Sequence, residues 1–143
     1  MKDLVKVEAL AERAATLELD GLDMFGYITM ATATREYNGI GPEYLPEDVR
    51  DKVTEKLSLF EPAALLHDLR NYLSDGTRTK FDYANKEFLR NCRKCANAEY
   101  PWYSLRRWRA RAAAKLMYDF VSSSFGWKAW MDCFYKNQKT TTK

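Results

Sequence analysis

The sequence predicts an all-α fold: a compact, mostly helical domain around an antiparallel helix pair, with a glycine-rich loop and a short extended N-terminal segment. Apolar residues recur at helical spacing along most of the chain. Proline and serine stand where several of these periodic segments begin, as is typical of helix starts. The 143 residues are 46% hydrophobic and 30% charged, which favours a globular chain over a disordered one. No repeat or linker divides the chain, so we expect residues 1–143 to form a single domain.

The N-terminal region, residues 1–33, is expected to hold one helix and an extended arm. Apolar residues recur at helical spacing over residues 3–18, which predicts an amphipathic helix. Asp20-Gly21 marks its end. Residues 24–34 are rich in β-branched and aromatic types, which favours a short strand or an extended arm.

The middle region, residues 34–96, is expected to contain a loop followed by helices. Gly39, Gly41 and Pro42 cannot continue a helix, so Tyr37–Pro42 is predicted to be a loop. We expect helices from Pro46 to about Leu57, from Pro62 to about Leu73 and from Lys80 to about Ala96, with a turn at Ser74–Thr77. The last two helices have a short connection and should therefore pack antiparallel.

The C-terminal region, residues 97–135, is basic and aromatic. Pro101 breaks the chain, and Ser104 is expected to cap a long helix that ends near Ser122. Gly126 should interrupt the helical pattern before a last short helix over Trp127–Tyr135. The polar tail, Lys136–Lys143, is expected to be frayed.

Composition and charge narrow the class of protein. No apolar run approaches the roughly 18 residues that a membrane span needs, and the charged N-terminus lacks the apolar core of a signal peptide. Three cysteines, an odd number, argue against a secreted disulfide framework. We therefore expect a cytoplasmic protein. Residues 1–62 carry 7 Lys/Arg and 13 Asp/Glu, whereas residues 63–143 carry 16 and 7, so the basic half is suited to an anionic partner.

The chain has one histidine, His67, so any histidine-dependent catalysis must use it. His67 and Asp68 are neighbours on a predicted helix and point about 100° apart. Such a pair can address two adjacent parts of one cleft, the histidine handling a water and the carboxylate a cation. Asp82 or Asn85 on the following helix is expected to face His67 and to fix its tautomer by a hydrogen bond.

The order of a YNGIGP loop, a PAALLHD helix and a YANKEFL helix resembles the phospholipase A2 superfamily, most closely the short, disulfide-poor forms in parvovirus capsid proteins. The chain is also similar to a family of small phage and prophage proteins of unassigned function. Arg111–Tyr118 and Gly126–Trp130 are similar to the late segment of those phage proteins. Together, the resemblance covers roughly residues 34–130.

The resemblance implies Ca²⁺-dependent hydrolysis of a phospholipid ester. Gly39 and Gly41 would belong to a calcium loop, Asp68 would be a calcium ligand and His67 the general base. A carboxylate on the second helix orients the histidine in the family, whereas this chain has Asn85 at that position. Asp82, one turn earlier, is the alternative partner.

Two other functions stay open. The departure at Asn85 favours a catalytically inactive structural or interaction protein on the same scaffold, such as a virion component or a host-takeover factor that binds other phage proteins. A third candidate is a protein that binds nucleic acid or an anionic membrane surface through a basic cluster. The cluster comprises Arg106, Arg107, Arg109, Arg111 and Lys115.

Two further patterns concern the C-terminal half. Trp108, Ala112 and Leu116 form an apolar stripe beside the basic cluster, and we expect this stripe to be buried. Cys92 and Cys95 form a CxxC pair that Cys133 and His67 would complete as a zinc site, a weak alternative because the pair falls within a predicted helix.

Overall fold

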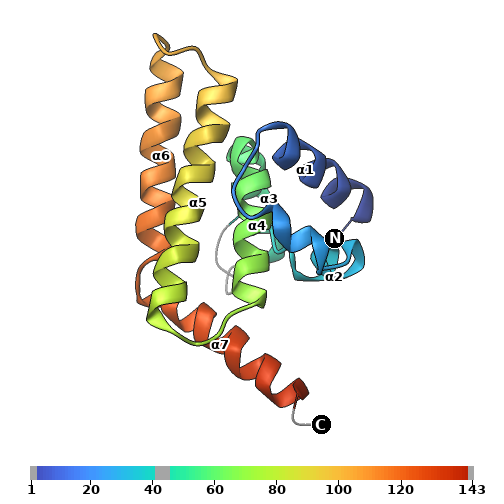
Figure 1. Cartoon of the computed structure of the whole chain (residues 1–143). Coiled ribbons are helices and arrows are strands. Elements are labelled where there is room, and N and C mark those ends of the chain that lie inside the picture. Colours follow the sequence, from blue (N-terminus) through green and yellow to red (C-terminus); the bar gives the residue numbers. More distant parts are fainter. Residues whose placement is uncertain (1–2, 41–45, 142–143) are drawn as a thin grey trace.

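The computed structural model describes residues 3–40 and 46–141, and 79% of the chain is helical. No residue within these ranges forms a strand, so the all-α prediction is confirmed. Figure 1 shows α4 behind the centre of the fold, with α5 and α6 on one side and α1 and α2 on the other. The elements are α1 (Leu4–Thr16), η1 (Leu22–Gly26), α2 (Met30–Glu36), α3 (Glu47–Lys56), η2 (Ser58–Phe60), α4 (Glu61–Tyr72), α5 (Arg78–Glu99), α6 (Leu105–Val121) and α7 (Ser124–Thr141).

Polar side chains cap the starts of several helices, and Ser104 does so where the sequence predicts it. The Asp3 carboxylate accepts the Val5 N–H at the start of α1. The hydroxyls of Thr77 and Ser104 accept backbone N–H groups at the starts of α5 and α6. Each cap satisfies a donor that has no partner within its helix.

The predicted antiparallel helix pair is α4 against α5. The Cys95 side chain, late in α5, contacts the Ala63 backbone, early in α4. At the opposite ends, the Arg70 guanidinium lies over the Tyr83 ring. The buried faces of both helices join one core, together with side chains from α1, α2 and α6.

The prediction of a strand or extended arm over residues 24–34 is wrong. This segment forms most of the 3₁₀-helix η1 and the start of α2, whose first turn is capped by the Thr29 hydroxyl on the Thr32 N–H. Met24 and Ala33 are buried in the main core. Burial on one side of a short helix has outweighed the weak strand preference of the β-branched residues.

The C-terminal helix is also longer than predicted. Gly126 lies inside α7 rather than before it, and the helix continues through the expected frayed tail to Thr141. A Cβ at Gly126 would lie 1.7 Å from the Val121 carbonyl oxygen, so the glycine permits a close approach of α7 to the end of α6. The Asn137 side chain donates to the Tyr72 carbonyl, which attaches α7 to the end of α4.

Candidate functional site

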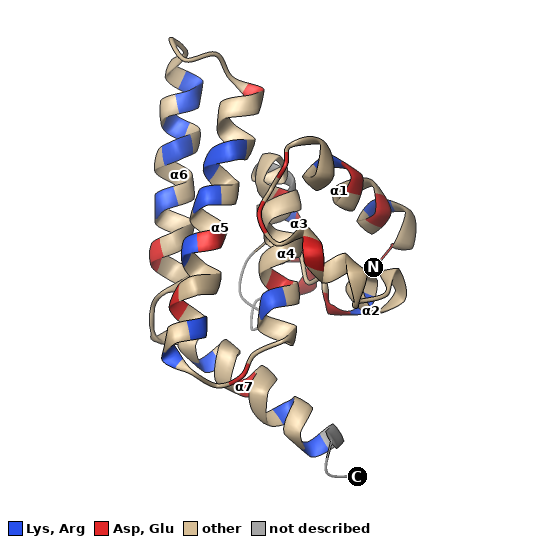
Figure 2. Cartoon of the chain, viewed as in Figure 1, with Lys and Arg blue, Asp and Glu red and all other residues tan. Residues whose placement is uncertain are grey.

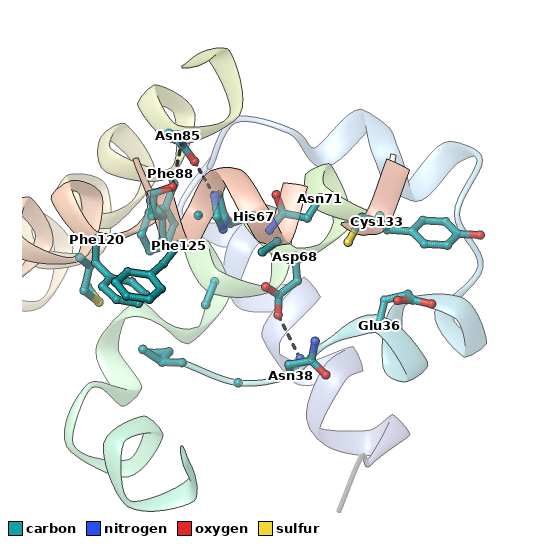
Figure 3. A pocket seen from close by; sticks show the side chains of 18 of the residues that line it. Glu36, Asn38, His67, Asp68, Asn71, Asn85, Phe88, Phe120, Phe125 and Cys133 are labelled. Atoms are coloured by element: carbon teal, nitrogen blue, oxygen red, sulfur yellow. Dashed lines mark hydrogen bonds between the residues drawn. The ribbon is translucent and has the colours of Figure 1, made fainter. Parts of the chain in front are cut away.

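His67 and Asp68 line one pocket of about 910 Å³. They leave α4 in different directions, as their adjacency on a helix requires. Figure 3 shows Asn85 and Phe88 beside His67, and Asn38 beside Asp68. The prediction that the two residues address adjacent parts of one cleft is therefore confirmed.

His67 is held by α5. The side chain is only 8% exposed, and its Nε2 lies 2.9 Å from Asn85 Oδ1. The Phe88 ring packs against the imidazole with 4.7 Å between ring centroids. Burial lowers the pKa of His67, and the hydrogen bond to Asn85 opposes this effect. The imidazole is therefore neutral at neutral pH.

The Asn85 amide determines which ring nitrogen carries the proton. Its Nδ2 donates to the Val121 carbonyl oxygen at 3.3 Å, and a carbonyl can only accept. Asn85 Oδ1 therefore faces His67 and accepts from Nε2, which must carry the hydrogen. Nδ1 is left with the lone pair that a general base needs.

Asp82 does not take part in this arrangement, so its predicted role as a partner of His67 is wrong. Its side chain is 53% exposed and pairs with Arg78 on the same helix, with 3.6 Å between the charged atoms. Asp82 precedes Asn85 by three residues, which turns its side chain about 60° around α5. That rotation moves the carboxylate from the α4 side of the helix to solvent.

The loop after α2 meets α4 at Asp68. The Asn38 backbone N–H donates to Asp68 Oδ2 at 3.0 Å, and the Tyr37 hydroxyl donates to Glu61 at 2.7 Å. Gly39 has φ +81°, and a Cβ there would lie 2.8 Å from Thr54 Oγ1. The loop thus needs glycine at this position, for both its backbone conformation and its contact with α3.

The expected calcium ligands are brought together only in part. Asp68 and Gly39 line the same pocket, whereas Gly41 lies outside the described residues. Within residues 3–40 and 46–141, no three His, Cys, Asp or Glu side chains are grouped as a metal site would require. Ca²⁺ takes roughly six to eight oxygen ligands, so the described groups do not by themselves form its cage.

The zinc alternative also lacks support from the described residues. Cys92 and Cys95 are fully buried in the core, and neither lines the His67 pocket. Burial raises the pKa of both thiols, that of Cys95 to about 11, which disfavours the thiolate that binds zinc. Cys133 lies apart from them, on the α7 wall of the pocket.

Sequence reasoning missed the apolar wall of the pocket, which comes from α6 and α7. Phe120 and Phe125 stack there with a centroid separation of 5.8 Å and an interplanar angle of 11°. The available signal was the helical spacing of apolar residues near the end of α6. The wall includes Leu116, Met117, Phe120, Val121 and Phe125.

The basic cluster lies on α6, and none of its five residues lines the His67 pocket. Figure 2 shows Lys and Arg along α6 and on α5. Arg111 donates to Asn97 at 3.2 Å, and Lys115 pairs with Asp119. The prediction that the neighbouring stripe is buried is wrong, because Trp108 is 72% and Leu116 70% exposed. α6 instead presents its alanine-rich face to the core through Ala110, Ala113 and Ala114.

Comparisons with protein-family models, with curated proteins and with solved structures found no match. Among the described residues, no helix has the length and apolar character needed to cross a bilayer.

Proposed function

We propose that this protein is a phospholipase A2-like hydrolase that binds an ester with an apolar chain in the His67 pocket. The observation that carries the proposal is the hydrogen bond of 2.9 Å by which Asn85 holds His67 Nε2 beside a largely apolar pocket. A neutral, oriented histidine is the usual general base for activating water.

The proposed reaction needs one base and one water. His67 Nδ1 accepts a proton as the water oxygen attacks the ester carbonyl carbon. The tetrahedral intermediate then expels the alkoxide, which receives the same proton, and the products are a carboxylic acid and an alcohol. Asn85 Oδ1 stabilises the transient imidazolium through its hydrogen bond, although less than a carboxylate would.

Calcium remains part of the hypothesis only through the resemblance. When bound, Ca²⁺ would stabilise the oxyanion of the intermediate. The described residues supply Asp68 and Gly39 but too few oxygens for a full site, so we assign no step to the cation. Assays with Ca²⁺ and with a chelator test this part separately.

A second candidate is a binding or interaction protein that uses the same pocket without chemistry, for example a phage virion component. The observation that favours it is the amide at Asn85, which carries no charge to offset an imidazolium. In this case the pocket holds an apolar ligand, and His67 is a packed polar residue.

The discriminating experiment measures fatty-acid release from phospholipid vesicles. We expect the wild type to hydrolyse phospholipid and His67→Gln to lose activity by about 100-fold or more, a typical contribution of a general base. Asp82→Asn is the matched control on α5, and its rate should equal the wild-type rate because Asp82 points away from the pocket.

Equal background rates for the wild type and His67→Gln, with and without Ca²⁺, would exclude the hydrolase and leave the binding protein. Asn85→Asp refines the test. A carboxylate beside Nε2 should raise the pKa of His67 and keep or increase the rate, if the variant tolerates the loss of the hydrogen bond to Val121.

A further inference from the structure

The face of α6 that points away from the core carries several large apolar side chains. Among them Leu105 is 75% exposed and Trp108 72%. Further exposed apolar side chains extend this face at both ends of the helix. We call the set the α6 strip, and it comprises Trp102, Leu105, Trp108, Leu116, Phe120 and Phe125. Large exposed apolar side chains aligned along one helix face indicate an interaction site.

Cations lie within and beside the α6 strip. At 100° per residue, Arg109 falls between Leu116 and Phe120, with Arg106 just beyond Phe120. On the other side Lys115 lies next to Trp108, and its partner Asp119 falls between Trp108 and Leu105. α6 carries five Lys or Arg residues and a single acid, Asp119. A second copy of the strip would bring like charges together, whereas an anionic surface would complement them.

The pattern favours a lipid surface over nucleic acid. On this face Leu105, Trp108 and Leu116 outnumber the one cation among them, Arg109, whereas a nucleic-acid site would place several cations against phosphates. A helix with Trp, Leu and Phe on one face and Arg or Lys beside them is typical of helices that lie in the membrane interface. The long arginine side chains can cover apolar groups and still reach lipid headgroups.

The α6 strip also joins the pocket. Leu116, Phe120 and Phe125 are members of the strip and line the His67 pocket as well. We propose that the α6 strip docks on an anionic lipid surface, so that the pocket opens where a lipid chain can enter it. This inference goes beyond the proposed hydrolysis and does not require it, because docking needs only the surface of α6.

Co-sedimentation with vesicles tests the proposal. We compare phosphatidylcholine vesicles with vesicles that also contain phosphatidylglycerol, at low and high salt. The wild type should partition preferentially to the anionic vesicles, and less so at high salt. Leu105→Ser with Trp108→Ser should weaken partitioning by about tenfold or more, since both apolar groups leave the interface. Arg106→Gln with Arg109→Gln should reduce the preference for anionic lipid.

Matched controls separate docking from folding and from hydrolysis. Val5→Ser with Tyr27→Ser removes two apolar groups of similar exposure, 73% and 61%, outside α6 and should leave partitioning unchanged. His67→Gln should abolish hydrolysis but retain partitioning. Circular dichroism confirms that each variant is folded.

Three results would overturn the proposal. The first is equal partitioning of the wild type and the Leu105/Trp108 variant. The second is equal binding of the wild type to neutral and anionic vesicles. The third is salt-dependent binding to a DNA or RNA oligonucleotide without binding to vesicles, which would identify α6 as a nucleic-acid surface instead.

Discussion

The buried histidine makes the stability of the protein depend on pH in a specific direction. In the unfolded chain His67 has an ordinary pKa near 6.5, whereas burial lowers its pKa in the folded protein. Below about pH 6.5 the unfolded state therefore binds more protons than the folded state. The contribution of His67 to folding is complete above that pH and is lost progressively as the pH falls towards the folded-state pKa.

The size of the effect follows from linkage. Each pH unit between the two pKa values costs about 1.4 kcal/mol of unfolding free energy. Because His67 is only 8% exposed and its Nε2–H is bonded to Asn85, little solvent screening reduces this effect. The loss therefore grows by about 1.4 kcal/mol for each pH unit below 6.5 until the folded-state pKa is reached.

His67→Gln isolates the effect, because glutamine keeps a side-chain N–H for Asn85 but does not titrate. Urea unfolding of both proteins across this pH range gives the difference in unfolding free energy. Asp20 and Asp75 have lowered pKa values, so their contributions are lost at more acidic pH and are the same in both proteins. We expect only the wild type to show the loss that His67 causes. Parallel pH profiles for the two proteins would refute the assignment of a buried, neutral His67.

Two further substitutions test the packing around the site. Gly126→Ala should destabilise the protein by about 2–3 kcal/mol in thermal unfolding, because its Cβ would lie 1.7 Å from the Val121 carbonyl oxygen. Gly26→Ala is the control and should be nearly neutral, because no atom lies within 4 Å of the added Cβ. Glu87→Ala should lower the free energy of unfolding in urea by about 3 kcal/mol, because Arg70 donates two hydrogen bonds to this buried carboxylate and would lose both. A change below about 1 kcal/mol would contradict a stabilising role of the Arg70–Glu87 pair.

The helix pair and one part of the site could be predicted from the sequence. Helical spacing and a short connection were enough to place α4 against α5. The sequence could not show whether Asp82 or Asn85 faces His67, because residues three apart lie near the same helix face and the rotation of α5 depends on its whole packing surface. In the structure Asn85 faces His67 and also donates a hydrogen bond to Val121, which is 36 residues away.

Other features depended on tertiary packing that local patterns do not contain. α6 has apolar residues on two faces, and periodicity alone favoured the one with larger side chains, Trp108 and Leu116. The smaller face, centred on Ala110 and Ala114, is the one that packs in the core, because small side chains let two helix backbones approach closely. This choice exposes Trp108 and creates the surface that we propose docks on lipid.

In the proposed function, an apolar ligand with a polar head binds beside a neutral His67. The most direct test is ¹⁵N NMR of the imidazole, whose signals are unambiguous because the chain has one histidine. We predict an Nε2-protonated neutral ring at neutral pH, whose signals shift saturably when a lysophospholipid is added below its micelle concentration. A ring protonated on both nitrogens, or signals that stay unchanged while the lipid binds elsewhere, would contradict the claim.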